Sequence, residues 1–118
     1  MAERLDAADL ARRIVDLLSD KQADNILLLD IRKVATFADY FVIASGTSER
    51  QINALLEAIR EELKTMDLKM RHQEGSAESG WVLLDLGDVV LHIFAPEERE
   101  YYDLESLWQA ATPVVRIQ

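Results

Sequence analysis

Carboxylates are the most frequent side chains of this sequence that could do chemistry. Asp85 and Asp88 stand across a Gly-containing turn, and Asp30 and Asp39 flank a connector, so these four could gather around Mg²⁺ or act as general acid and base. Their spacing does not demand such a site, and 22 acidic residues make chance neighbours common. We therefore rank capping and solvated roles above catalysis, and expect no enzyme, no metal and no other cofactor.

Histidines and one loop are the remaining candidates. The sequence has no cysteine, which excludes thiolate metal sites and leaves His72 and His92 as its only imidazoles, and a lone imidazole makes a poor metal site. Ser45-Gly46-Thr47-Ser48 precedes a helix start, where N–H groups favour anions. As a phosphate site it is weak, because it lacks the glycine spacing and the Lys of a phosphate loop, and a capping box of Ser48 and Gln51 already explains these residues.

The richest pattern is a hairpin with two different faces. The turn pair Gly87-Asp88 separates the runs Trp81–Leu86 and Val89–Phe94, and directly opposed residues of such a hairpin share a face. One face is aliphatic throughout, as expected of a sheet buried under helices, and consists of Val82, Leu84, Leu86, Val89, Leu91 and Ile93. The other face is mixed and consists of Trp81, Leu83, Asp85, Val90, His92 and Phe94.

The mixed face has two interpretations. Large aromatic side chains beside two ionisable groups are typical of a surface that binds another protein. Alternatively, the terminal segment covers this face, with His92 hydrogen-bonded to Asp85 in a satisfied pair. The residues that could provide such a cover are Tyr101, Tyr102, Leu104, Leu107 and Trp108. The pattern alone leaves both interpretations open.

A small mixed sheet has to position these residues. Helical spacing predicts a helix over 6–19, capped by Asp6, and a longer one that begins after Ser48. Strands are predicted over 26–31, 39–45, 81–86 and 89–94, with a short polar edge strand within 69–73. Pro96 fits the start of a short helix. The fold class is therefore α/β (α+β mixed), with a single mixed sheet of four to five strands, two main helices packed on one face and short C-terminal helical turns.

Length and charge set further bounds. The 118 residues, 49% of them hydrophobic, predict a single domain over 1–118 in which 1–5 and 109–118 are peripheral. The net charge of −9 argues against a groove for nucleic acid and makes a basic partner plausible. Neither a signal peptide nor a membrane-spanning run is found, so we expect a soluble, cytoplasmic protein.

Three blocks carry a family resemblance. They are Asp39-Tyr40-Phe41-Val42-Ile43-Ala44-Ser45-Gly46-Thr47-Ser48, then Gly80-Trp81 through Asp85-Leu86-Gly87-Asp88-Val89-Val90-Leu91-His92, then Arg99, Tyr102, Leu104-Glu105 and Leu107-Trp108. In this order they resemble the ribosomal silencing factor (RsfS) or iojap family over nearly the whole chain. The resemblance implies a repressor of translation that binds large-subunit ribosomal protein number fourteen and blocks joining of the small subunit. It also implies a possible role in large-subunit maturation.

The resemblance also assigns residues. It places Trp81, Asp85 and His92 in the family's hairpin signature, and a second group in its terminal signature. With their neighbours on the mixed face, the predicted partner-binding residues are Trp81, Leu83, Asp85, His92, Phe94, Arg99, Tyr102, Leu104 and Trp108. Asp85, with Asp39 and Glu105, would meet Lys or Arg of a basic ribosomal protein. A weak homodimer through the same patch is a further expectation.

The family resemblance also implies a topology similar to that of nucleotidyltransferases. The sequence lacks that class's Gly-Ser loop followed by an Asp-x-Asp strand, so no transferase activity is carried over. A metal-dependent, nucleotide-handling enzyme of nucleotidyltransferase-like topology remains the alternative function.

Overall fold

One mixed sheet organises the computed structural model, which describes residues 6–118. Within that range the chain forms, in order, α1 (Ala7–Asp20), β1 (Asp24–Asp30), β2 (Tyr40–Ser45), α2 (Glu49–Thr65), β3 (His72–Glu74), β4 (Trp81–Asp85), β5 (Val89–Phe94), α3 (Pro96–Tyr102), α4 (Leu104–Leu107) and β6 (Thr112–Ile117). The spatial order of the strands is β3-β4-β5-β2-β1-β6. β2 and β5 are parallel, and the other neighbours are antiparallel.

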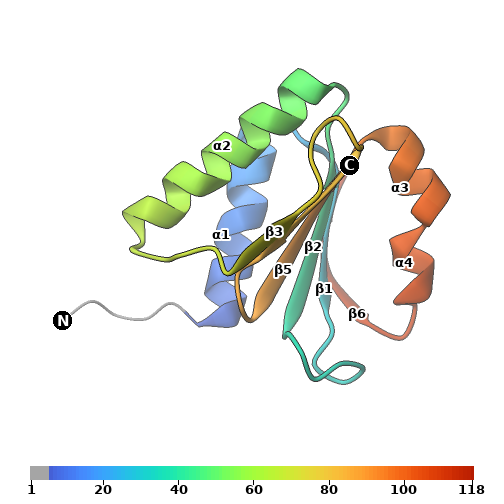
Figure 1. Cartoon of the computed structure of the whole chain (residues 1–118). Helices are drawn as coiled ribbons and strands as arrows, with labels where there is room; N and C mark the ends of the chain where they lie inside the picture. The colour runs from blue at the N-terminus through green and yellow to red at the C-terminus, as the bar shows by residue number, and fades with distance from the viewer. Residues whose placement is uncertain (1–5) are drawn as a thin grey trace.

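Helices cover both faces of this sheet. The two long helices, α1 and α2, lie on one face, whereas the short α3 and α4 lie on the other (Figure 1). The prediction of two main helices on one face is confirmed. Of the described helices, none is long and apolar enough to cross a membrane.

Both long helices begin where side-chain caps were expected. The Asp6 carboxylate accepts a hydrogen bond from the Asp9 N–H at 2.8 Å, and the Ser48 hydroxyl accepts one from the Gln51 N–H at 3.0 Å. Each cap satisfies an N–H group that has no partner within its helix. Beyond the caps, apolar residues at helical spacing face the sheet, so both predicted helices are confirmed.

The predicted hairpin forms in the predicted register. Trp81 pairs with Phe94 and Leu83 with His92, while the Leu86 N–H closes the turn by donating to the Val89 carbonyl at 2.9 Å. Gly87 takes the positive φ of 96° that this turn needs. The aliphatic face packs under α1 and α2, and five of its six residues are fully buried: Val82, Leu84, Val89, Leu91 and Ile93.

The predicted strand count was too low, because the described chain forms six strands. The additional strand is β6, which pairs with β1 along one edge of the sheet. Its sequence holds Pro113, which lacks an N–H, and Val114 bulges out of the ladder and stays exposed. A strand with these features shows no alternation of apolar and polar residues, so its pattern gave no strand signal.

Candidate functional site

Aromatic rings fill the space between the sheet and α3–α4. Trp81 stacks on Phe94 with ring centroids 5.0 Å apart and contacts Tyr102 at 4.6 Å. Phe41 meets Trp108 edge-on, with a centroid separation of 4.9 Å. This surface is called the aromatic face below, and its rings are those of Phe37, Phe41, Trp81, His92, Phe94, Tyr102 and Trp108.

The terminal segment covers the aromatic face only in part. Of the nine predicted partner-binding residues, the buried ones are Phe94, His92, Arg99 and Leu104. Trp81, Leu83, Asp85 and Trp108 are half-buried, and Tyr102 is 45% exposed. The interpretation as a covered face therefore holds only in part, since α3 and α4 leave several of these side chains open to solvent. The open side chains remain candidates for contact with a partner.

His92 is buried without the partner that the sequence suggested. Its Nδ1 accepts a hydrogen bond from the Trp81 indole N–H at 3.2 Å. The Asp85 carboxylate instead accepts the Gly87 N–H at 2.8 Å and so holds the hairpin turn. The expected His92–Asp85 pair was wrong, because a turn N–H two residues away is the closer donor for Asp85. Burial lowers the pKa of His92 to about 4, so its ring is neutral at physiological pH.

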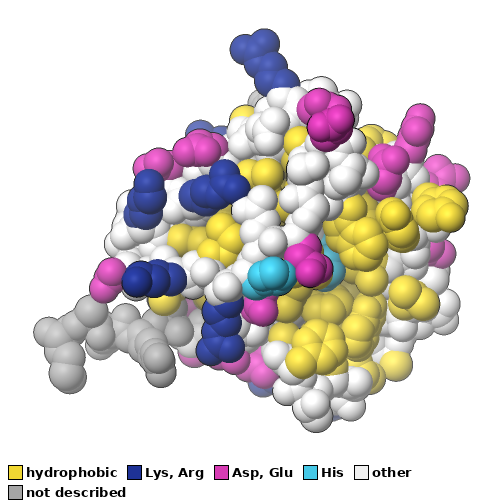
Figure 2. Space-filling model, viewed as in Figure 1, with side chains coloured by type: hydrophobic (Ala, Val, Ile, Leu, Met, Phe, Trp, Pro, Cys, Tyr) yellow, Lys and Arg dark blue, Asp and Glu magenta, His cyan; other side chains and the backbone are white. Residues whose placement is uncertain are grey.

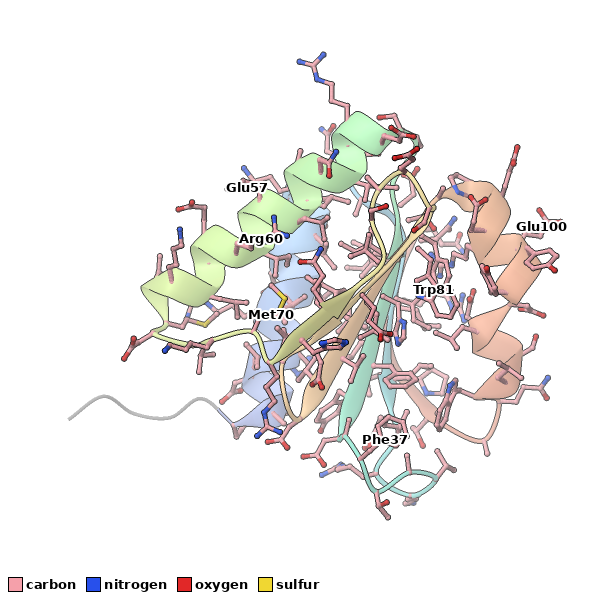
Figure 3. All side chains as sticks on the ribbon, in the orientation of Figure 1. Phe37, Glu57, Arg60, Met70, Trp81 and Glu100 are labelled. Carbon is pink, nitrogen blue, oxygen red and sulfur yellow. The ribbon has the colours of Figure 1, made fainter. Side chains whose placement is uncertain are left out.

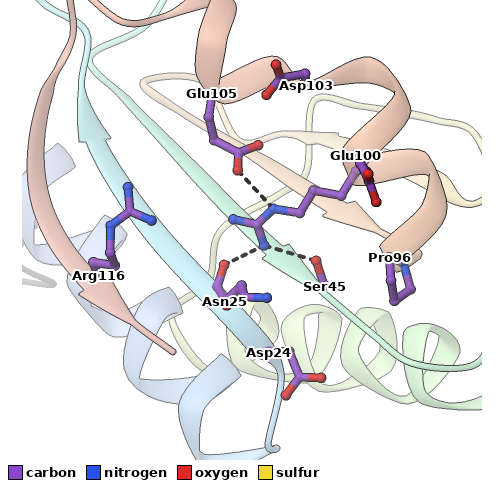
Figure 4. A pocket seen from close by; sticks show the side chains of 9 residues that line it. Asp24, Asn25, Ser45, Pro96, Glu100, Asp103, Glu105 and Arg116 are labelled. Atoms are coloured by element: carbon purple, nitrogen blue, oxygen red, sulfur yellow. Dashed lines mark hydrogen bonds and ion pairs between the residues drawn. The ribbon is translucent and has the colours of Figure 1, made fainter.

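Arg99 ties the two short helices to the sheet (Figure 4). Its guanidinium donates to the Asn25 carbonyl, to the Ser45 hydroxyl at 2.9 Å and to the Glu105 carboxylate at 3.2 Å. Asn25 lies on β1, Ser45 ends β2 and Glu105 lies on α4. Arg99 is therefore inside the fold, and its hydrogen bonds position α3 and α4 over the aromatic face.

The most exposed apolar side chains of the described range include one that sequence reasoning missed, Phe37, and two that it considered as a cover, Tyr101 and Leu107. Phe37 is 61% exposed, Leu107 is 75% exposed and Tyr101 is 81% exposed. Phe37 lies in the loop after β1, which the sequence marks only as a connector, yet its ring contacts Phe41 and Trp108 at 5.9 Å. Trp81 and Phe37 lie on the side of the sheet that faces α3 and α4, whereas Glu57 and Arg60 project from α2 on the other side (Figure 3). Phe37 lies outside the predicted strand 39–45, so no periodic pattern in the sequence identifies it.

An open pocket of about 350 Å³ lies within this face. Its walls are mostly apolar, with Asp85 and His92 as the ionisable members. The lining residues are Phe37, Phe41, Leu83, Asp85, Val90, His92, Leu104 and Trp108. A mostly apolar pocket with a few polar groups is the usual form of a recognition site.

Carboxylates edge the aromatic face. In the β3–β4 pairing His72 lies opposite Asp85, and Glu74 lies opposite Leu83, so β3 extends the same face with further polar groups. Figure 2 shows hydrophobic side chains gathered over this side of the molecule, next to Asp and Glu, while Lys and Arg gather over α2 and the segment that follows it. The aromatic face thus combines apolar area with negative charge.

Of the four carboxylates considered for metal chemistry, those of Asp30 and Asp85 accept hydrogen bonds from nearby residues. The Asp30 carboxylate accepts three hydrogen bonds from the Arg32 side chain, at 3.0, 3.2 and 2.7 Å, and one from the Arg32 N–H at 3.0 Å. These bonds lower the pKa of Asp30 to about 2. Asp39 and Asp88 meet through their backbones, where the Asp39 N–H donates to the Asp88 carbonyl at 2.8 Å. Residues 6–118 contain no group of three His, Cys, Asp or Glu side chains that could hold a metal ion.

The fold and this site define a class of protein. A small α/β domain with a half-open aromatic surface, edged by carboxylates, has the form of a module that binds another macromolecule. The family model described as "Ribosomal silencing factor during starvation" matches residues 4–118. The chain belongs to the ribosomal silencing factor family, as its three sequence blocks predicted.

Individual relatives agree with this assignment. The chain is 44% identical over 89 residues to the ribosomal silencing factor RsfS of Bacillus subtilis, covering 75% of each protein. It is 36% identical to a mouse protein named for mitochondrial assembly of the ribosomal large subunit, covering 80% of this chain and 43% of that protein. A crystal structure of a Chromobacterium violaceum protein superposes with a TM-score of 0.84 at 32% identity, covering 89% of this chain and 88% of the other.

Proposed function

We propose that this chain represses translation by docking its aromatic face on the large ribosomal subunit, where its bulk keeps the small subunit from joining. The docking site would be large-subunit ribosomal protein number fourteen, as the family resemblance implies. Family membership and the name of the mouse relative support a large-subunit partner. The single observation that carries the choice of surface is the half-covered aromatic face, because exposed aromatic clusters of this kind anchor protein interfaces.

Exposure divides eight of the nine predicted residues into two groups, and the ninth, His92, is 3% exposed. Trp81, Leu83, Asp85, Tyr102 and Trp108 keep accessible surface and would contact the partner. In contrast, Phe94 is 0% exposed, and Arg99 and Leu104 are 8% exposed. These three would act by holding the contacting side chains in place, as the Arg99 hydrogen bonds to β1, β2 and α4 indicate.

Charge suits a basic partner. The chain carries a net charge of −9, and Asp85 and Glu74 lie on the strands that form the face. Opposite charge accelerates encounter and discriminates against acidic partners. Steric repression needs affinity and bulk, so the mechanism requires no reaction at this site. It would operate in the cytoplasm, and a weak homodimer through the same face would compete with it.

Co-sedimentation with separated large and small ribosomal subunits tests the proposal. We expect the wild-type chain to sediment with large subunits alone. Trp81→Ala should weaken that binding by about 2 kcal/mol or more, roughly thirtyfold, because a central aromatic anchor is lost. Met70→Ala is the matched control, since Met70 packs against the core on the α1–α2 side.

Two results would decide against the proposal. Wild-type protein that sediments with neither subunit would exclude the function, and binding that survives in Trp81→Ala would exclude the aromatic face as the contact surface. Unfolding curves of both variants are needed beside the binding data, because Trp81 also stacks on Phe94.

A further inference from the structure

One buried polar atom on the aromatic face has no partner. His92 is 3% exposed, and its Nε2 makes no hydrogen bond to any residue in the described range 6–118. Leaving a buried donor or acceptor unpaired destabilises the folded chain, because the group loses its hydrogen bonds to water and gains none in return. Buried polar groups are nearly always paired in native proteins, so an orphan in a binding pocket calls for a functional explanation.

The Trp81 side chain determines what Nε2 can offer. The indole N–H donates to His92 Nδ1 at 3.2 Å, so Nδ1 presents its lone pair there. In a neutral imidazole the proton then sits on Nε2, which makes Nε2 a hydrogen-bond donor. Burial keeps the pKa of His92 near 4, so the ring stays neutral and this tautomer persists at physiological pH.

The surroundings of His92 select the kind of acceptor. His92 lines the 350 Å³ pocket together with Asp85, whose second carboxylate oxygen has no hydrogen bond to any of residues 6–118. An anionic acceptor would be repelled by Asp85 and by the net charge of −9. A neutral oxygen is compatible with both, and a cation nearby would be attracted by Asp85 and by the aromatic rings.

We propose that the pocket receives a segment of a basic protein, which places a backbone carbonyl oxygen on His92 Nε2–H and a Lys or Arg side chain against Asp85. This inference rests on the proposed function and specifies how the partner is recognised. Nε2 has almost no accessible surface in the free chain. Binding therefore requires side chains at the entrance of the pocket to change rotamer, and the accessible ones there are Phe37, which is 61% exposed, and Trp108, which is half-buried.

Two substitutions at position 92 test the hydrogen bond. His92→Phe keeps a ring of similar shape and removes the donor, whereas a Gln side chain carries an N–H at a distance comparable to Nε2. We expect His92→Phe to bind large subunits about tenfold more weakly than wild type. We expect its unfolding free energy to change little, because the substitution removes the unpaired Nε2–H and also the Nδ1 acceptor of the Trp81 indole N–H. His92→Gln should recover most of the affinity.

Affinity and unfolding free energy, measured on both variants, separate recognition from structure. If His92→Phe binds as tightly as wild type, no carbonyl uses Nε2 and the inference fails. If His92→Phe is less stable than wild type and both variants lose affinity alike, His92 is purely structural and the inference also fails. Failure of the wild-type chain to bind large subunits is a different result, because it removes the proposed function itself.

Discussion

The two faces of this sheet differ in packing and exposure, and under the proposed function this difference divides stability from recognition. On the α1–α2 side the buried core is aliphatic apart from Tyr40, and its largest side chains are fully enclosed. On the α3–α4 side, rings, an imidazole and an arginine network share the space, and large apolar side chains remain exposed. Both unpartnered buried side-chain atoms found in residues 6–118, His92 Nε2 and Glu105 Oε1, are on this second side.

This contrast has a physical reason. Close-packed aliphatic side chains contribute burial free energy without polar groups that must be paired. A surface that binds another protein needs exposed apolar area and polar groups held ready for the partner, and both lower the stability of the free chain. Placing the two requirements on opposite faces lets β4 and β5 serve both, because successive residues of a strand point to opposite sides.

The largest expected effect comes from a matched pair of neighbours on β4. Leu84 is 0% exposed on the aliphatic side, and Leu84→Ala should reduce the unfolding free energy by about 3 kcal/mol or more. Leu83 is half-buried on the aromatic face, so Leu83→Ala should cost about 1 kcal/mol in stability and weaken large-subunit binding. Chemical denaturation and co-sedimentation measure the two quantities. Equal losses of unfolding free energy at both positions would contradict the proposed division between a stabilising side and a binding side.

The next effect is a pH dependence of the unfolding free energy that arises from His92 on the aromatic face. Burial lowers the folded-state pKa of His92 to about 4, from 6.5 in the unfolded chain, so the unfolded chain takes up this proton first as pH falls. The unfolding free energy is therefore highest above pH 6.5, and it falls by about 3 kcal/mol as the pH is lowered from 6.5 to 4. Chemical denaturation of wild type and His92→Phe across this pH range compares how the unfolding free energy of each depends on pH. If His92 keeps an ordinary pKa, the two dependences should be the same.

A smaller loss is expected when the link between the helices and the sheet is removed. Arg99→Ala deletes the hydrogen bonds to Ser45 and Glu105, and it leaves the Glu105 carboxylate, whose side chain is 31% exposed, without its cation. We expect a stability loss of about 2 kcal/mol and faster hydrogen exchange in α3 and α4. Exchange in α1 should not change. Uniform acceleration across both faces would show that Arg99 supports the whole fold.

The smallest effect belongs to the cap of α2. Ser48→Ala removes the acceptor for the Gln51 N–H and should lower the unfolding free energy by about 1 kcal/mol. Because α2 lies on the side away from the aromatic face, large-subunit binding at a temperature where the variant is folded should match wild type. Thermal unfolding and co-sedimentation check the two halves of this expectation. Weaker large-subunit binding by Ser48→Ala would show that the α1–α2 side also contributes to binding.

Local signals explain what could be predicted from the sequence. Gly87-Asp88 defined the hairpin and its register, and from the register both faces followed. Ser48 and Asp6 marked helix starts, because capping depends on residues within one turn. The family blocks located Trp81 in the face that the hairpin pattern had already distinguished.

Features that depend on distant contacts were not predictable in the same way. β6 became a strand only by pairing with β1, against the signal of Pro113. Phe37 joined the aromatic face because its loop folds back over Phe41. Arg99 was expected at the interface, yet it reaches the Asn25 carbonyl 74 residues away, a contact that no local pattern encodes.

Thiol labelling tests the central claim, that the aromatic face is the docking surface, most directly. The chain has no cysteine, so Phe37→Cys and Glu57→Cys each place a single reactive thiol, one beside the pocket and one on α2 at the opposite side. Maleimide labelling rates are compared with and without saturating large subunits. We predict that bound subunits protect Phe37→Cys strongly and leave Glu57→Cys unchanged. Protection of Glu57→Cys with free labelling of Phe37→Cys would place the docking surface on α2 and contradict the account.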